Sequence, residues 1–524
     1  MAYQRTTFGA LQQWADAVGD QSWTYDNVSS YYQKSLNFTP PDMSKRMANA
    51  TPKWDSNTLG QGGPLDLTYS NQASAFSTWA AKAFEYLGMA PIDGFTSGRL
   101  FGSGWLVSTI NQTSGFRESS EAAFLAPYTN RKNLALYNNT LAEKILFDGN
   151  KANGVRVNDT KKSFKLKARR EVIVSSGAIQ SPQLLLVSGV GPADLLKKHG
   201  IPIVADRPGV GQNLIDHVFF GIDWPVKVQT ASVLSNDKDG SVLREAVKQF
   251  NDSQTGILAS PGGEFAAYQD VPTDLRNRFS PQSIKGMFVE YPGRKYPTDM
   301  STLELATLPK DWPELQFFPL PSYIGDFDWP GTQDPQDGRM YATILATLIA
   351  PMSRGNISIK SSSMQDSPLI NPNWLTSQTD IDIAIAGFRR LRQIYATPAL
   401  REITDYQEEY PGFHVQSDKE VHQAIKKSFQ SMYHPSSTCK MGKGDDPSAV
   451  VDSQGRVIGI KNRESNSVFL MRPGADMTIT VRIADASVFP FLPPGECWKF
   501  IERAICKANA KNSPGLPMGT ICKF

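Results

Sequence analysis

Cysteine is scarce in this chain of 524 residues. Only four cysteines occur, and three of them (Cys497, Cys506 and Cys522) lie in the last 28 residues. The rest of the chain holds Cys439 alone, so an internal disulfide is excluded there. The cysteines and the five histidines show no metal-ligand spacing, and no metal site is predicted.

Long apolar runs are also missing. The best run, from Tyr341 to Met352, is about half of the ~20 residues that a membrane span needs, and it contains Pro351. The first residues, from Met1 to Trp14, have no apolar core behind basic residues. The sequence therefore predicts neither a membrane span nor a signal peptide.

Charge of one sign does not dominate, since the formal net charge is +3. No basic stripe with interleaved aromatic residues occurs, and we predict no binding of nucleic acid. Eight N-x-S/T sequons fit either a secretory route or chance in a chain rich in Asn and Ser, so secreted and cytoplasmic locations both stay open. The sequons begin at Asn27, Asn37, Asn49, Asn111, Asn138, Asn158, Asn251 and Asn356.

The composition is that of a large folded protein. Apolar residues make up 40% and charged residues 20%, and the length suits two or three domains. Alternating patterns predict a strand and then a hairpin, and later apolar runs predict further strands. These predicted strands are 133–137, 144–147, 155–157, 164–166, 172–175, 265–268, 315–319, 340–348 and 355–360. A helix is predicted from Asp380 to Tyr395, with Arg389, Arg390 and Arg392 on a solvated face.

The segment from Glu171 to Pro192 is the most informative part of the sequence. A short β-forming run ends at Gly177, and Ser181 is the predicted N-cap of a buried helix that closes at Gly189. A strand, a turn of small residues and a helix let the backbone approach a nucleotide cofactor closely. An ordinary strand–helix unit without a cofactor fits this pattern equally well.

Several blocks together resemble the glucose–methanol–choline (GMC) family of flavoprotein oxidoreductases, and most closely its fungal aryl-alcohol and choline dehydrogenase types. The blocks are GFRESSEAAFL (115–125), GAIQSPQLLLVSGVG (177–191), RPGVGQNLIDH (207–217), SRGNISIKS (353–361), SPLINPNWL (367–375), YHPSSTCKMG (433–442) and IADASVFPFLPPG (483–495). The resemblance implies an FAD enzyme that oxidises an alcohol to a carbonyl, with oxygen or a quinone as electron acceptor. It also suits a role of this enzyme in fungal secondary metabolism. The eight sequons are consistent with a glycoprotein.

The same resemblance implies roles for individual residues. The family's catalytic base falls on His434, and a neutral imidazole can accept a hydroxyl proton near neutral pH. His217 matches a family position that we interpret as structural. The remaining positions, which are expected to contact FAD, are Gly177, Ala178, Asp485 and Ala486.

The chain departs from the family pattern in three places. No GxGxxG turn for the pyrophosphate occurs, and the sequence aligns from the segment after that loop. Residues 463–480 intervene between two blocks that abut in the family, which indicates an aberrant insert or a genuine loop. Glu496 stands where the family has a His or Asn, and the tail 497–524 does not resemble the family helix. Glu496 is a poor substitute, since a carboxylate cannot donate a hydrogen bond unless it is protonated.

The predicted fold class is α/β. It combines an incomplete Rossmann-like FAD lobe with an α+β substrate lobe on an antiparallel sheet. The predicted division is a bridging segment (1–104), the first part of the FAD lobe (105–218), the substrate lobe (219–430), the second part of the FAD lobe (431–496) and an atypical tail (497–524). Two alternatives to an alcohol oxidoreductase stay open: an inactive fragment without FAD, and a lyase or cyclase on the same fold.

Overall fold

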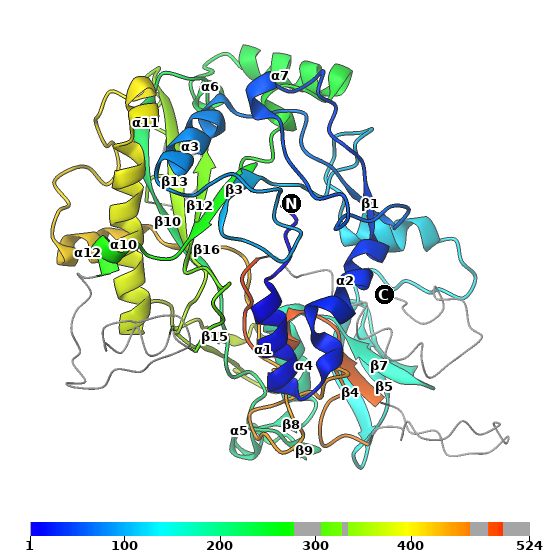
Figure 1. The fold of residues 1–524 in the computed structure, drawn as a ribbon. Helices are drawn as coiled ribbons and strands as arrows, with labels where there is room; N and C mark the ends of the chain where they lie inside the picture. Colours follow the sequence, from blue (N-terminus) through cyan, green and yellow to red (C-terminus); the bar gives the residue numbers. More distant parts are fainter. Residues whose placement is uncertain (1, 277–304, 306, 327–333, 462–479, 496–524) are drawn as a thin grey trace.

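The computed structural model describes residues 2–276, 305, 307–326, 334–461 and 480–495. Two lobes are visible in Figure 1, one around β10, β12 and β13 and one around β4, β5 and β7. Most of the predicted insert and the whole tail 497–524 lie outside the described residues. Thr480, which we placed in the insert, is instead the first residue of a strand.

A six-stranded antiparallel sheet forms the centre of the first lobe, in the strand order β16-β10-β13-β12-β11-β3. Its strands are β3 (Gly102–Trp105), β10 (Val218–Val226), β11 (Phe265–Gln269), β12 (Leu315–Leu320), β13 (Met340–Leu348) and β16 (Gln430–Ser431). The strands predicted over 265–268, 315–319 and 340–348 are thus confirmed. All nine residues of β10 are buried, so both faces of the sheet are covered at this strand.

Helices cover one face of this sheet. They are α3 (Ala75–Tyr86), α10 (Gln378–Tyr395), α11 (Pro398–Ile403) and α12 (Asp418–Ser428). Phe84 of α3 packs on Phe265 and Phe317, with ring centroids 6.1 and 6.3 Å apart. Side chains alternate along a strand, so Gln316 and Phe318 point to the opposite face. These two side chains line a small cavity that His217 and His434 also border.

Helix α10 confirms the predicted helix but not its solvated basic face. Arg390 is buried and donates to the Leu87 carbonyl and to the Gln269 side chain, at 3.0 and 3.1 Å. Arg392 donates to both oxygens of Glu408, at 2.8 and 2.7 Å. The side chains are long enough to reach acceptors on packed neighbours, which periodicity alone does not reveal.

The second lobe contains a three-stranded antiparallel meander of β4 (Leu141–Asp148), β5 (Lys151–Asn158) and β6 (Ser163–Lys167). These strands confirm the predicted hairpin. The strand predicted over 133–137 is wrong, because these residues form turns and irregular structure. Leu136 and Tyr137 are more than half exposed, so an alternating pattern there has no buried face to serve.

The predicted strand–turn–helix unit is present, with an earlier helix start. Strand β7 (Glu171–Val174) pairs in parallel with β17 (Thr480–Ile483), and α4 (Gly177–Val187) follows. Ser181 is therefore inside the helix and is not its N-cap. Pro182 cannot donate to the carbonyl of Ala178 one turn earlier. The Thr438 hydroxyl donates to the Ala178 carbonyl instead, at 2.6 Å, and the helix therefore tolerates the proline.

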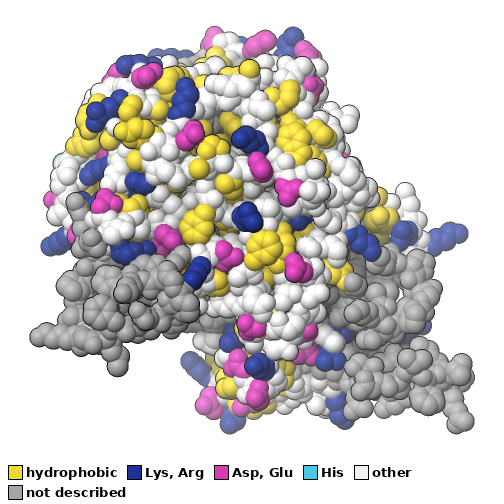
Figure 2. Space-filling model, viewed as in Figure 1, with side chains coloured by type: hydrophobic (Ala, Val, Ile, Leu, Met, Phe, Trp, Pro, Cys, Tyr) yellow, Lys and Arg dark blue, Asp and Glu magenta, His cyan; other side chains and the backbone are white. Residues whose placement is uncertain are grey.

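The remaining elements connect and cover the two lobes. The helices are α1 (Phe8–Val18), α2 (Tyr25–Ser35), α5 (Ala193–Lys198), α6 (Ser232–Ser235), α7 (Ser241–Ser253) and α8 (Thr273–Arg276), and the short strands are β1 (Leu36–Phe38), β2 (Leu65–Leu67), β8 (Val190–Gly191), β9 (Ala205–Asp206), β14 (Asn356–Ser358) and β15 (Leu369–Asn371). None of the helices in the described ranges is long and apolar enough to cross a membrane. Basic and acidic side chains are interspersed on the face in Figure 2.

Candidate functional site

His434 lies on the loop that follows β16, and one carboxylate fixes this loop. Asp216, just before β10, accepts a hydrogen bond from the His434 backbone N–H at 3.0 Å and another from the Ser431 hydroxyl at 2.5 Å. Burial raises the pKa of Asp216, while the Ser431 hydroxyl and His434 oppose that shift. Tyr433 has a φ of +61°, so the chain turns sharply before the histidine.

A second histidine lies directly against His434. The Nδ1 atoms of His217 and His434 are 3.1 Å apart, and the rings are 5.4 Å apart at 76°. His217 is buried, and burial, followed by the charge of His434, lowers its pKa well below 6.5. It therefore stays neutral at neutral pH, and one of the two Nδ1 atoms must carry the shared proton.

The sequence predicts a catalytic role for His434 and a structural role for His217. The two histidines are brought together by the sheet register, in which Val218 of β10 pairs with Ser431 of β16. This pairing brings together residues 217 positions apart, and it cannot be derived from a local pattern. His217 therefore lines the cavity beside His434, a placement that no local pattern in the sequence predicts.

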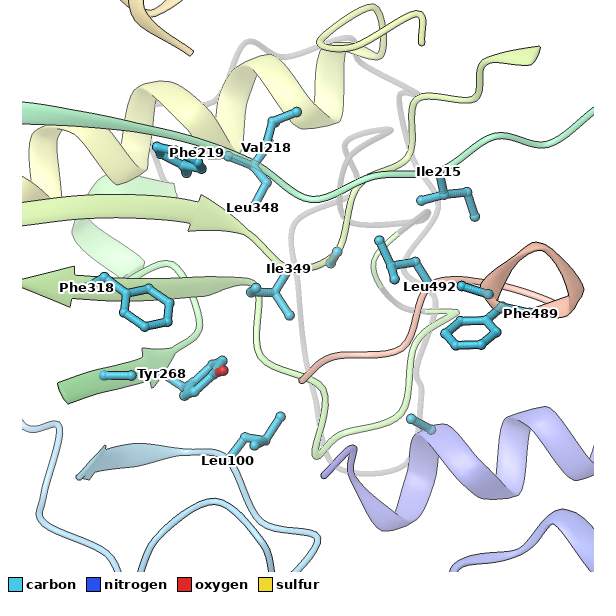
Figure 3. Close-up of a cluster of buried hydrophobic side chains, with 14 of the residues drawn as sticks. Leu100, Ile215, Val218, Phe219, Tyr268, Phe318, Leu348, Ile349, Phe489 and Leu492 are labelled. Carbon is cyan, nitrogen blue, oxygen red and sulfur yellow. The ribbon is translucent and has the colours of Figure 1, made fainter. Parts of the chain in front are cut away.

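The histidine pair borders a small cavity of about 20 Å³, room for roughly one water molecule. The Tyr268 hydroxyl donates to the Gln4 side-chain carbonyl and accepts from the Gln316 side-chain amide. In Figure 3 that hydroxyl is the one polar side-chain atom among the labelled residues, and it points away from its strand. The cavity is lined by Gln4, His217, Tyr268, Gln316, Phe318, Ile349, Met432, His434 and Gly495.

The four residues predicted to contact the cofactor meet at the carboxyl ends of β7 and β17. Asp485 accepts from the Gly177 N–H at 3.0 Å and from the Ser487 N–H at 2.8 Å, and the Ser181 hydroxyl donates to it as well. Its carboxylate therefore holds the turn together. Ala178 and Ala486 are buried beside it. We infer that the backbone of the turn, rather than the Asp485 side chain, faces a ligand.

A larger cavity of about 550 Å³ opens at the same turn. Gly177 has a φ of +78°, and a Cβ there would meet no atom within 4 Å. The carboxyl ends of parallel strands are the usual ligand edge of an α/β sheet. The cavity is lined by Ser176, Gly177, Ala178, Ile179, Gln180, Leu214, Asp216, Ile370, Pro372, Trp374, Ser431, Tyr433 and Pro435.

We tested whether these residues fit FAD. The lining is mostly apolar and includes the aromatic rings of Trp374 and Tyr433, which suits a planar ring, and the volume lies in the range of cofactor pockets. The sequence has no GxGxxG turn to hold the pyrophosphate. The residues therefore fit part of FAD, while the phosphate-binding turn of the predicted family has no counterpart in this sequence.

Comparison with known proteins gives concordant results. Two family models, both described as GMC oxidoreductase, match residues 1–219 and 351–464. The chain is 48% identical over 498 residues to "Dehydrogenase pyvF" of Aspergillus violaceofuscus, which covers 94% of this chain and 72% of that protein. It is 40% identical over 496 residues to "Patulin synthase" of Penicillium expansum, with 94% and 73% covered.

A solved structure agrees at the level of the fold. The FAD-dependent oxidoreductase from Chaetomium thermophilum superposes with a TM-score of 0.78 at 22% identity, covering 98% of this chain and 85% of that one. An identity this low shows the fold alone. The predicted combination of a Rossmann-like lobe and an antiparallel substrate lobe is confirmed by this match.

Proposed function

This chain belongs to the GMC oxidoreductase family of FAD-dependent enzymes, and from that premise we propose that it oxidises the CH–OH group of a small or medium alcohol with His434 as the base. The observation that carries the proposal is the contact between the Nδ1 atoms of His434 and His217 at 3.1 Å. It engages the Nδ1 atom of His434, so a proton that His434 takes from an alcohol would go to its Nε2 atom.

The residues of the site have separate roles in the proposed reaction. When His434 carries its proton on Nδ1 and donates it to His217, its Nε2 atom is unprotonated and can accept the hydroxyl proton of the alcohol. Asp216 holds the backbone of this loop through its bond to the His434 N–H. FAD, when bound, supplies the acceptor for the hydride that leaves the same carbon.

We propose that FAD is held at the carboxyl ends of β7 and β17. The backbones of Gly177, Ala178 and Ala486 would contact it, while Asp485 keeps the turn in shape. The exposed edge of this turn and the aromatic cavity beside it support the assignment. In this proposal the FAD lobe comprises 105–218 and 431–496, and the substrate lobe comprises 219–430.

We propose a substrate and an acceptor only by class. The relatives named above carry the names of a dehydrogenase and a synthase from fungi, which supports an alcohol intermediate of fungal secondary metabolism. An electron acceptor such as oxygen or a quinone would complete the cycle. The cavity beside His434 is small, which favours a compact reacting end over a bulky one.

The test is anaerobic reduction of the bound flavin by a panel of primary alcohols. His434→Ala should slow this reduction by roughly a hundredfold or more, because the base is removed, and should leave the FAD content unchanged. His414→Ala is the matched control, because His414 is exposed and does not line the cavity. Equal rates for the two variants would overturn the role of His434.

Two other functions are separated by the same spectra. An inactive fragment would not retain FAD, and the observation that supports this alternative is the single ladder partner of β7 among the described strands. Such a chain would show no flavin absorbance after incubation with FAD and removal of the excess. A lyase or cyclase would keep the flavin, and no alcohol would bleach it.

A further inference from the structure

The eight N-x-S/T sequons are a feature of the chain that the proposed reaction does not use. A sequon accepts an N-linked glycan where its Asn side chain is accessible, which is typical of a surface loop. All eight lie in the described residues, so their accessibility can be compared directly. The exposed Asn residues are Asn27, Asn49, Asn138 and Asn251, and the other four are partly buried.

Carboxylates hold three of the partly buried Asn side chains. Asn37 and Asn111 both donate to Asp66, at 2.9 and 2.6 Å. Asn158 donates to Glu143 at 3.1 Å. A glycan takes the place of one of the two amide hydrogens, and it also needs space around the nitrogen. These three sequons are therefore poor acceptors in the folded protein.

Helical geometry disfavours three of the four exposed sequons. A sequon pairs an Asn with a hydroxyl two residues later, so the enzyme that transfers the glycan must reach both side chains together. On a helix, side chains two residues apart do not face each other. This applies to Asn27 in α2, to Asn251 in α7 and to Asn49 in a short 3-10 helix (Ala48–Ala50).

Asn138 differs from these residues because it lies in a turn on an exposed loop. All residues from 131 to 139 except Leu134 are exposed, and Asn138 and Asn139 form the turn just before β4. The Thr140 hydroxyl donates to the backbone carbonyl of Asn138 at 2.9 Å, so both parts of the sequon lie close together. Within the described part of the chain, the Asn138 side chain makes no hydrogen bond.

The residues just before this sequon are apolar and exposed. Leu136 and Tyr137 are exposed by 54% and 52%. The Tyr137 ring contacts Phe164 of β6, with ring centroids 5.9 Å apart, and β6 is an edge strand of its sheet among the described strands. Exposed apolar side chains beside a strand edge favour association with other chains. A glycan on the next residue would lie at this edge and keep other chains away.

We propose that Asn138 carries an N-linked glycan, added as the chain passes through the secretory route, and that this glycan shields Leu136, Tyr137 and the edge of β6. The Asn138 Nδ2 atom forms a bond to the anomeric carbon of an oligosaccharide carried by a lipid diphosphate. The bond from that carbon to the diphosphate oxygen breaks, the amide loses one proton, and the lipid diphosphate leaves. This proposal is independent of the proposed function.

The test is expression of the full chain in yeast behind a cleavable secretion signal, followed by enzymatic release of glycans in isotopically heavy water. Release converts each glycosylated Asn to a labelled Asp, and peptide mass spectrometry then measures the occupancy of every sequon in secreted and retained protein alike. We expect most chains to be occupied at Asn138 and almost none at Asn37, Asn111 or Asn158. An empty Asn138, or a higher occupancy at any of the other three, would overturn the inference.

Variants separate the glycan from other effects of the turn. Thr140→Ala destroys the sequon and keeps Asn138, whereas Thr140→Ser preserves the sequon, so only the alanine variant should lose the glycan. Thr113→Ala, which destroys the sequon of Asn111, is the matched control and should leave the glycan mass of the protein unchanged. Loss of the same mass in Thr113→Ala and not in Thr140→Ala would contradict the assignment.

Limited digestion measures the shielding. Chymotrypsin binds aromatic side chains, and exposed loops are its preferred sites, so Tyr137 is a cleavage site where no glycan covers it. Cleavage there should be several-fold faster in Thr140→Ala than in wild type or Thr140→Ser. Wild type stripped of its glycan should be cleaved as fast as Thr140→Ala, which excludes an effect of the lost hydroxyl. Equal cleavage of glycosylated and stripped wild type would refute the shielding of Tyr137.

Discussion

At the scale of single residues, Asp216 determines where His434 lies. Its two oxygens accept from the His434 N–H and from the Ser431 hydroxyl, and the carboxyl is buried. Neither contact involves the substrate. Asp216 is therefore a positioning residue, and its replacement should affect the reaction through the geometry of the loop.

We expect Asp216→Ala to lower the rate of flavin reduction roughly a hundredfold, because a small displacement of a reacting group is costly. Asp216→Asn should recover most of the rate, since its amide oxygen can still accept from the His434 N–H. Stopped-flow reduction at saturating alcohol measures both variants. An Asn variant as slow as the Ala variant would contradict the positioning role.

Sequence reasoning succeeded and failed at this scale for clear reasons. His434, Gly177 and Asp485 stand in blocks that resemble the family, and the structure places them at the two cavities or beside them. The contact of His217 with His434 and the hydrogen bond from the His434 N–H to Asp216 depend on the register of β10 against β16. A register between strands so distant in sequence has no local signature.

At the scale of elements, an ion pair between Arg392 and Glu408 joins α10 to the segment after α11. Glu408 has a fully buried side chain, and it accepts two hydrogen bonds from Arg392. Arg392 also donates to the Val415 carbonyl at 2.6 Å. The pair ties the helix to a loop that has little regular structure.

We expect Glu408→Gln to lower the free energy of unfolding by about 3 kcal/mol, because it leaves the charge of Arg392 uncompensated. Urea unfolding followed by circular dichroism measures the loss. Asp252→Asn on α7 is the control, since its pair with Lys248 is exposed and should contribute less than about 1 kcal/mol. Equal losses in the two variants would contradict this view of the anchor.

Asp223 on β10 makes the stability depend on pH. Its carboxyl accepts from the N–H groups of Ile324 and Gly325 and from the Thr343 hydroxyl, and it is fully buried. Burial, with a smaller contribution from the charge of Asp334, raises its pKa from 3.8 to about 7. The fold therefore favours the protonated carboxyl more than the unfolded chain does.

The sign of the effect follows from this difference. Stability contributed by Asp223 is fully present below about pH 4 and is lost as the pH rises to about 7. We expect Asp223→Asn to remove this part of the slope, so that the difference in unfolding free energy between wild type and variant changes across that range. Parallel curves for the two proteins from pH 4 to 7 would contradict the assignment.

The limits of sequence analysis are different at this scale. Alternation and apolar runs located the strands of the central sheet, but the start of α4 and the burial of Arg390 and Arg392 were not predicted. Each depends on a tertiary partner: Thr438 for the helix that contains Pro182, and Glu408 for Arg392. Local patterns cannot specify such partners.

At the scale of the whole molecule, the sheets of the two lobes differ in size. Among the described residues the sheet around β13 has six strands, whereas β7 and β17 form a sheet of two. Parallel sheets are normally covered by helices on both faces. A ligand bound at their carboxyl ends would therefore stabilise this lobe more than the other.

We expect saturating FAD to slow hydrogen exchange at the amides of β7, α4 and β17 several-fold, because binding to the folded state opposes local opening. Exchange at β13 should not change, and it serves as the internal control. Mass spectrometry of peptides from each strand measures both. Slowing at β13 alone, or in neither lobe, would contradict the location of the cofactor site.

The Asp485 carboxylate also has a consequence for the order of folding. It is synthesised 308 residues after Gly177 and 304 residues after Ser181, the partners that it holds. During synthesis the turn after β7 lacks its acceptor until the chain through Asp485 has been made. The antiparallel lobe can form earlier, since domains generally fold as units during synthesis. The edge formed by this turn is thus completed after the antiparallel lobe.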